Sequence, residues 1–578
     1  MTAAHAQAAA PTAERLRPER TDATRYLCAA AYLDEDFART VLDEVLYQSH
    51  RSVAPSHGFS VVPVVRHCLA TRRRTLLRDA VVTVLLLAGL VASPTAGVVL
   101  AMTVLSLWLL VRGVGLLYRR QVTAGLVHVG LSVLVGPLAT AVLLVGPNLL
   151  SGMSVFALVF YGLQQPGALL GRWFFTFLAG LLIWLTYFLD RLKVHQTIAV
   201  ELTRDVFEPD RAPAAGPDSE QRLDYLDKAQ QGNLTLYSES AGADPFVGFG
   251  DVYRRWSLVA PLRAAGPAAQ PGTNAAAVTS PEAVPFSTDE LYEAIRSGMV
   301  DLGQRHRPQD DVMPHLSVRD RVFVAGRLPT TSEYLFQGRP LSRLFPEQVR
   351  QVGHTERGRV RHYQAVRMAA WNGELEVTTF LHASQRGRML FIEFVATVMP
   401  GIRPAYRRID TYDRFDVGAK LRAAGLAVGD LIRSPRAVLN LVARASAAVR
   451  RSLDEASEDQ RIGRQLAFDY GSRVSVREMG SNPNGLVGFQ LYDADERMRI
   501  IERHVVEVLA QFLRHHGYDL SEFAGQMSTV INSTRIENSN TFNNSTLNSS
   551  SVAAGSSASA SASTVSQSQP STSPVPPT

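Results

Sequence analysis

A long stretch of this chain carries almost no charge. Between positions 80 and 188 the only charged side chains are four arginines, Arg112, Arg119, Arg120 and Arg172. Inside a bilayer every backbone polar group needs a partner within the protein, so an apolar stretch of this kind predicts membrane helices. Each crossing takes about 20 apolar residues, and the stretch is long enough for several. The predicted fold class is a membrane α-helical bundle joined to a cytoplasmic α+β region.

Turn residues and charges divide the stretch into spans. We predict four, at about 76–93, 97–117, 123–145 and 168–190. Residues 149–163 are short for a crossing and fit either a re-entrant segment or a fifth span. Arginines gather before the first span and after the second, so the positive-inside rule places both termini in the cytoplasm. The pattern predicts a multi-pass protein of the bacterial plasma membrane, with the lipid bilayer as one partner.

The rest of the chain divides by composition. The predicted parts are a disordered start (1–22), a cytoplasmic helical cap (23–75), a connecting helix with short strands and linkers (191–286), an α+β domain (287–527) and a tail. In the first part of the tail, 528–553, apolar residues recur about every five positions among Asn, Ser and Thr. This spacing fits either a short β-solenoid-like coil or low-complexity disorder. Residues 554–578 are predicted to be disordered.

The α+β domain has the clearest local pattern. Ser287 and Glu290 form a possible capping box at the start of a helix. A three-stranded meander is predicted from 362–370, 374–383 and 389–398, with Asn372 and Gly373 supplying the positive φ of a tight hairpin. Helices are predicted at 413–425, 436–455 and 493–516, with a strand at 473–477.

Few residues suggest chemistry. The one candidate ligand-binding set is Arg357, Arg359, Arg361 and His362, a basic stretch just before the meander that is suited to a phosphate or another anion. A solvated loop is the alternative. No catalytic set, metal site or cofactor motif is recognisable, which favours a protein that is not an enzyme. The net charge of +6 comes without a basic face interleaved with aromatic residues, so no nucleic-acid partner is expected.

Three short segments carry a resemblance. They are RYLCAAAYL at 25–33, HRSVAP at 50–55 and VVRHCL at 64–69. Together they resemble a group of uncharacterised actinobacterial multi-pass membrane proteins, mainly over residues 25–80. The resemblance implies a bacterial plasma-membrane protein and transfers no functional residue.

Three functions are compatible with these observations. The leading hypothesis is a non-enzymatic membrane protein whose cytoplasmic α+β region binds a protein partner or a small ligand. The second is an oligomeric pore or transport component that the same region gates. The third is a membrane-tethered enzyme that acts on a phosphate-bearing substrate through the arginine-rich stretch. A homo-oligomer is compatible with all three.

Overall fold

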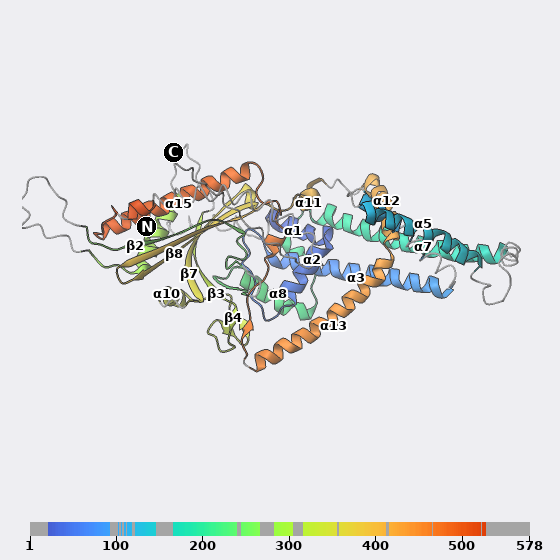
Figure 1. Ribbon diagram of the computed structural model, residues 1–578, viewed down its shortest axis with the longest axis horizontal. Helices are drawn as coiled ribbons and strands as arrows, with labels where there is room; N and C mark the ends of the chain where they lie inside the picture. The colour runs from blue at the N-terminus through green and yellow to red at the C-terminus, as the bar shows by residue number, and fades with distance from the viewer. Residues whose placement is uncertain are drawn as a thin grey trace, which may run out of the picture.

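The computed structural model describes residues 21–92, 109–110, 112–117, 122–145, 166–239, 244–265, 283–304, 316–354, 358–411, 416–464, 466–521 and 523–527, with positions 102 and 106. A six-stranded sheet with helices against it forms one end of the molecule, and long helices form the other (Figure 1). The predicted disordered start up to residue 20, the predicted re-entrant segment 149–163, about half of the second predicted span and the tail 528–578 lie outside the described residues.

The main sheet has the strand order β1-β3-β7-β8-β9-β2. Its strands are β1 (Leu234–Tyr237), β2 (Asp251–Pro261), β3 (Ser317–Ala325), β7 (Val360–Ala370), β8 (Leu375–Arg386) and β9 (Met389–Met399). β1 runs parallel to β3, and every other neighbouring pair is antiparallel. β7, β8 and β9 are the predicted meander, which is confirmed. At the first hairpin Gly373 has the expected positive φ of 86°, but the second positive φ, 53°, belongs to Trp371 and not to Asn372 as predicted.

Two helices cover one face of this sheet. α9 (Thr288–Gln304) and α15 (Phe489–His515) bury apolar residues of their inner faces against the strands (Figure 1). The capping box that opens α9 is confirmed, because Ser287 and Glu290 exchange two hydrogen bonds of 3.2 Å. α15 matches the helix predicted at 493–516. Since successive side chains of a strand point to opposite faces, the other strand residues face away from these helices.

A cluster of aromatic rings lies on the opposite face. Phe380 is fully buried, and its ring centroid is 4.6 Å from that of Phe246 and 4.8 Å from that of Phe249. The loop that carries Phe246 and Phe249 is held by Glu478, whose carboxylate accepts hydrogen bonds from the Gly248 and Gly250 backbone N–H groups at 2.7 and 3.0 Å. The cluster therefore joins the sheet to a loop outside it.

Glu478 lies on a short helix where a strand was predicted. The strand prediction for 473–477 is wrong: the chain forms α14 (Val476–Met479), and the Ser475 hydroxyl accepts from the Glu478 N–H at 3.5 Å as its N-cap. Serine favours this position because its side chain supplies the acceptor that the first turn of a helix lacks.

Helices from the N-terminal part form a second core. They are α1 (Asp22–Leu33), α2 (Glu35–Val41), η3 (Leu42–Leu46), the first half of α3 (Val61–Ala92) and α8 (Pro217–Gln230). Asp34 ends α1 and caps α2, accepting from two backbone N–H groups at 3.0 and 3.1 Å. The buried Arg25 side chain is 2.6 Å from the Asp410 carboxylate, which follows β9 in the chain. An ion pair therefore ties the N-terminal helices to the sheet region.

The remaining elements are shorter or lie at the ends of the molecule. The helices are α5 (Val122–Val145), α7 (Pro166–Gln196), η5 (Thr197–Glu201), η6 (Pro209–Arg211), α10 (Pro346–His354), η7 (Trp371–Gly373), α11 (Pro404–Arg407), η8 (Arg408–Thr411), α12 (Val417–Ile432) and α13 (Pro435–Gly463). The short strands β4 (Arg327–Leu328) and β10 (Phe468–Asp469) pair with each other, as do β5 (Leu335–Phe336) and β6 (Arg339–Pro340).

The membrane interpretation is not supported. Within the part of the chain that the structure describes, no helix combines the length and the apolar character that a bilayer crossing requires. The predicted bundle of four or five spans is therefore wrong, and so are the multi-pass plasma-membrane location and the three functions that depended on it. Two of the predicted spans, 76–93 and 168–190, also have charged residues at one end that the structure buries in ion pairs. Arg78 and Asp79 of α3 and Asp190 of α7 are mostly buried and form ion pairs with one another.

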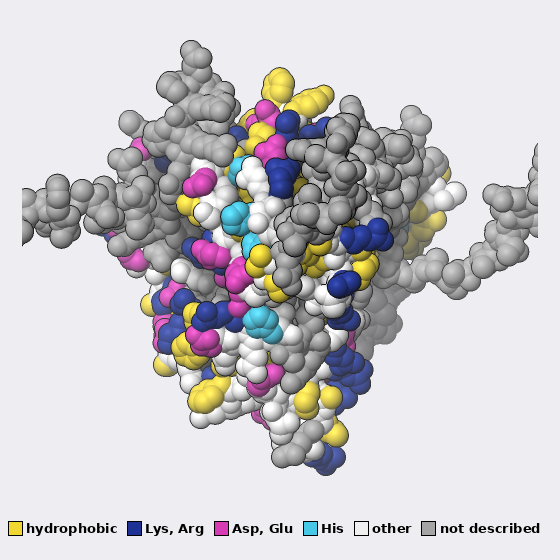
Figure 2. All heavy atoms as spheres, turned by 90° about the vertical axis from the view of Figure 1, so that its left-hand side faces the viewer, with side chains coloured by type: hydrophobic (Ala, Val, Ile, Leu, Met, Phe, Trp, Pro, Cys, Tyr) yellow, Lys and Arg dark blue, Asp and Glu magenta, His cyan; other side chains and the backbone are white. Residues whose placement is uncertain are grey.

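The sheet end of the molecule has a mixed surface. Figure 2 shows acidic, basic and histidine side chains close together on this end, with apolar side chains between them. Neither sign of charge dominates the coloured part of this view. Surface charge alone therefore does not mark a ligand site at this end of the molecule.

Candidate ligand-binding site

A cavity of about 490 Å³ opens on the sheet face that carries the aromatic rings. We call it the arginine–aromatic pocket, and it is lined by Tyr237, Asp244, Pro245, Phe246, Val252, Arg255, Phe323, Gly358, Arg359, Arg361, Tyr363 and Val395. The aromatic side chains pack edge to face, with 5.5 Å between the ring centroids of Phe246 and Tyr363 and 5.2 Å between those of Phe246 and Phe323. The pocket thus combines an apolar aromatic wall with three arginines.

One buried carboxylate organises the arginines. Glu393, on β9, is only 2% exposed. It accepts a hydrogen bond of 3.1 Å from Arg361 of β7, another of 3.1 Å from Arg255 of β2, and one of 2.9 Å from the Tyr363 hydroxyl. Hydrogen bonds to a charged partner are stronger than neutral ones, so Glu393 fixes the two guanidinium groups in place.

The arginines still face solvent. The Arg255 and Arg361 side chains are 62% and 51% exposed, although Glu393 beneath them is almost fully buried. Arg359 lies in the turn just before β7, two residues before Arg361, and its Nη1 donates to the Arg327 carbonyl at 3.4 Å. Three arginines thus lie beside two carboxylates, the buried Glu393 and Asp244 of the lining, which leaves one positive charge over.

Burial changes the ionisation of the other lining residues. It raises the pKa of the Tyr363 hydroxyl, and the neighbouring Glu393 carboxylate raises it further, so this tyrosine remains a neutral donor. Burial also raises the pKa of Asp244 and of Tyr237. The electrostatic balance of the pocket therefore favours an anion.

The structure separates the predicted ligand set. Arg359 and Arg361 both line the arginine–aromatic pocket, whereas His362, the next residue along β7, points to the other face of the sheet. Arg357 lies outside the described residues. The period of two along a strand explains the separation. A sequence argument that extended the predicted strand back to Arg359 would have placed the arginines together and His362 apart.

His362 lies in a different environment. Its Nε2 is 3.2 Å from the Asp320 carboxylate, and its ring packs edge to face on Tyr292 at 4.8 Å. Arg296 of α9 donates to the other oxygen of Asp320 at 2.6 Å. These residues line a wider cavity of about 1210 Å³ between the sheet, α8, α9 and α10.

Sequence reasoning missed Arg255 and Glu393. Glu393 lies on the predicted strand 389–398, whereas Arg255 lies outside the predicted strands. β2 and β9 are far apart in the chain, and only their antiparallel pairing brings the two residues together. Glu393 is the one acidic residue in an otherwise apolar strand, and that was the available signal. A charged residue in a buried position usually has a partner.

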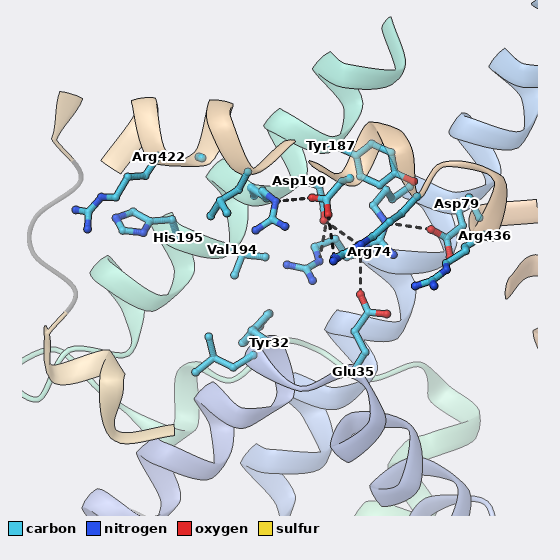
Figure 3. Close-up of a pocket in the computed structure, with 18 of the residues that line it drawn as sticks. Tyr32, Glu35, Arg74, Asp79, Tyr187, Asp190, Val194, His195, Arg422 and Arg436 are labelled. Carbon is cyan, nitrogen blue, oxygen red and sulfur yellow. Dashed lines mark hydrogen bonds and ion pairs between the residues drawn. The ribbon is translucent and has the colours of Figure 1, made fainter. Parts of the chain in front are cut away.

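A third cavity, of about 690 Å³, lies among the long helices (Figure 3). Arg74 and Arg78 of α3 are 3.2 and 3.3 Å from Asp190 of α7, and Arg78 is also 3.0 Å from Asp79. Arg444 of α13 reaches the second oxygen of Asp79 at 3.0 Å. Burial raises the pKa of Asp79 above its ordinary value. The central acids of this ion-pair cluster pair with arginines of other helices, so the cluster links α3, α7 and α13.

Comparison with known proteins identifies the region that contains the pocket. The family model described as the AbeC-like domain matches residues 255–546, just over half of the chain. The match includes all three arginines of the pocket, Glu393 and the helices α9 to α15. It does not include residues 25–80, so it does not bear on the resemblance seen there. No curated protein and no solved structure matches the chain significantly. The chain belongs to the AbeC-like domain family.

Proposed function

We propose that the protein binds a small anionic ligand, with a planar ring attached to a phosphate or carboxylate group, in the arginine–aromatic pocket. The observation that carries the proposal is the placement of Glu393. This buried carboxylate holds two half-exposed arginines, Arg255 and Arg361, at fixed positions beside an aromatic wall.

The arginines account for the anionic group. A guanidinium offers planar, paired donors that match a carboxylate or a phosphate, and less side-chain entropy is lost when the guanidinium is already held in place. Arg359 supplies a further cation, and the hydrogen bond that it makes to a described residue is a long contact to the Arg327 carbonyl oxygen. Two or three guanidinium groups can therefore donate hydrogen bonds to the same anionic group of the ligand.

The aromatic wall accounts for the ring. Phe246, Phe323 and Tyr363 line the cavity, each no more than 4% exposed, and aromatic groups attract one another in offset or edge-to-face arrangements. The cavity volume of about 490 Å³ lies within the ordinary range for small-molecule sites. A ligand with an anionic group alone would leave this surface unused.

Calorimetric titration of the full chain tests the proposal with three matched probes: phenyl phosphate, inorganic phosphate and phenol. Phenyl phosphate should bind more tightly than either half alone. Arg359→Gln should weaken its binding by about tenfold or more, since one hydrogen bond to a charged group contributes about 1.5–3 kcal/mol. Phe246→Leu should weaken the binding of phenyl phosphate and leave that of phosphate nearly unchanged.

The matched control is Arg503→Gln on α15, whose side chain is 84% exposed and, among the described residues, pairs with Glu507 of its own helix. This variant should bind phenyl phosphate as the unmodified protein does. Equal affinities of the unmodified protein and Arg359→Gln for phenyl phosphate would overturn the proposal, as would the absence of binding by all three probes.

A further inference from the structure

The helix α13 is attached to the molecule by its polar side. It runs along one edge, from the long helices to the small β4–β10 sheet (Figure 1). Near its start Ala437 is buried against the α3 and α7 cluster, and near its end Ile462 packs on the core around β1 and β3. Between these points the contacts are ionic: Arg444 is 3.0 Å from Asp79, and Arg451 is 3.1 Å from Asp43.

The opposite side of α13 is apolar and exposed. Leu439, Val442, Val449 and Leu453 are 68%, 63%, 61% and 65% exposed. With Ser446 and Ala456 they follow the alternating three-and-four spacing of a coiled-coil seam over about three heptads. Arg444, Arg451 and Glu458, which face the body of the protein, recur every seven residues about half a turn away from this seam. A surface helix normally turns its apolar side to the core, so the orientation of α13 is inverted.

Charge along α13 indicates what covers this seam. The first part of the helix has only arginines, at positions 436, 444, 450 and 451. The next turns have four acids, at positions 454, 455, 458 and 459. A parallel pair of such helices would place each acid level with the same acid of the other copy. In an antiparallel pair the acidic part of each helix lies beside the first turns of the other helix. Those first turns contain no acidic residue, so like charges are kept apart.

We propose that α13 is a self-association surface, and that two copies of the chain pair through an antiparallel α13–α13 coiled coil. The most symmetric register places Leu439 opposite Ala456, Val442 opposite Leu453 and Ser446 opposite Val449. Each contact then occurs twice about a two-fold axis, as in other dimers of identical subunits. This inference is independent of the proposed ligand and of its pocket.

Sedimentation of the purified full chain over a range of concentrations tests for the dimer. The double variant Val442→Glu, Val449→Glu should weaken it about a hundredfold or more, because it places unpaired carboxylates in the seam. Both side chains point to solvent in the single chain, so the folded monomer should keep its melting temperature and its binding of phenyl phosphate. Val487→Glu, at another position that is 60% exposed, is the control and should leave the dimer intact.

Disulfide formation between two single-cysteine variants tests the register. Val442→Cys mixed with Leu453→Cys should give a mixed disulfide, and neither variant alone should cross-link, because positions 442 of the two copies lie about 16 Å apart along the axis. The native Cys28 and Cys68 are fully buried and should not compete. The proposal is overturned if the chain sediments as a monomer throughout, if the double variant still dimerises, or if Val442→Cys cross-links to itself.

Discussion

Removing the ion pair between Arg444 and Asp79 should lower the free energy of unfolding. Both the size of this loss and its dependence on pH follow from the burial of Asp79. The Asp79 side chain is 1% exposed, and its two oxygens are 3.0 Å from Arg78 and 3.0 Å from Arg444. Removing the only partner of a buried charge costs about 3–5 kcal/mol. Since Arg78 remains in Arg444→Gln, we expect about half of this, roughly 2 kcal/mol of unfolding free energy at about pH 8.

The cost should disappear in acid. Burial raises the pKa of Asp79 in the folded protein above its ordinary value, so Asp79 becomes neutral in the folded chain at a pH where it is still ionised in the unfolded chain. A neutral carboxyl group does not need Arg444. The difference between the unmodified protein and Arg444→Gln should therefore be complete above the folded pKa and should decrease as the pH falls through it.

Urea unfolding of both proteins at a fixed protein concentration, at several values between about pH 8 and pH 4, measures this difference. Arg450→Gln on the same helix is the matched control, because Arg450 is exposed and, among the described residues, its side chain bonds to Ser446 of its own helix at 3.3 Å. It should cost less than about 0.5 kcal/mol at every pH. A difference for Arg444→Gln that showed no decrease on acidification, down to the lowest pH at which both proteins stay folded, would refute the reasoning, as would one below about 0.5 kcal/mol at about pH 8.

Two further predictions concern the N-terminal core and the loop beside the aromatic rings. His67 is 3% exposed, and burial lowers its pKa to about 4. Its contribution to stability is complete above the unfolded pKa of about 6.5 and is lost as the pH falls toward 4, a change of about 3 kcal/mol. In His67→Gln the free energy of unfolding, measured in urea, should therefore depend less on pH over this interval. Gly250 and Gly387 both have positive φ, but a Cβ on Gly250 would lie 2.2 Å from the Val398 carbonyl oxygen, whereas one on Gly387 would meet nothing within 4 Å. In thermal unfolding Gly387→Ala should cost about 1 kcal/mol and Gly250→Ala more than about 3 kcal/mol, and equal costs would contradict the steric argument.

Local patterns in the sequence predicted local structure well. The meander β7–β8–β9 and the capping box at Ser287 depend on residues that are close in the chain, and both are confirmed. The pairing of β1 with β3 joins residues about 90 positions apart, and neither strand has a pattern that specifies its neighbour. Long-range pairing of this kind has no signature in periodicity.

The candidate site could be predicted only in part. Arg359 and Arg361 were found as a basic stretch, and their role as pocket residues stays a proposal. Arg255 and Glu393 come from other strands, so the composition of one segment could not reveal them. The membrane prediction failed for a related reason. It counted apolar residues along single segments and took no account of the acid–arginine pairs that join α3, α7 and α13 in space.

The parallel pairing of β1 with β3 also affects how this family should be expressed and studied. The matched region begins at residue 255, after β1 and within β2, yet β1 covers one side of β3. A fragment cut at that limit would expose the backbone N–H and C=O groups of β3 along a free border, which is a common starting point for aggregation. It would also leave Asp410 without Arg25. The homology boundary is therefore not a folding boundary, and a soluble truncated protein has to retain the N-terminal helices and β1.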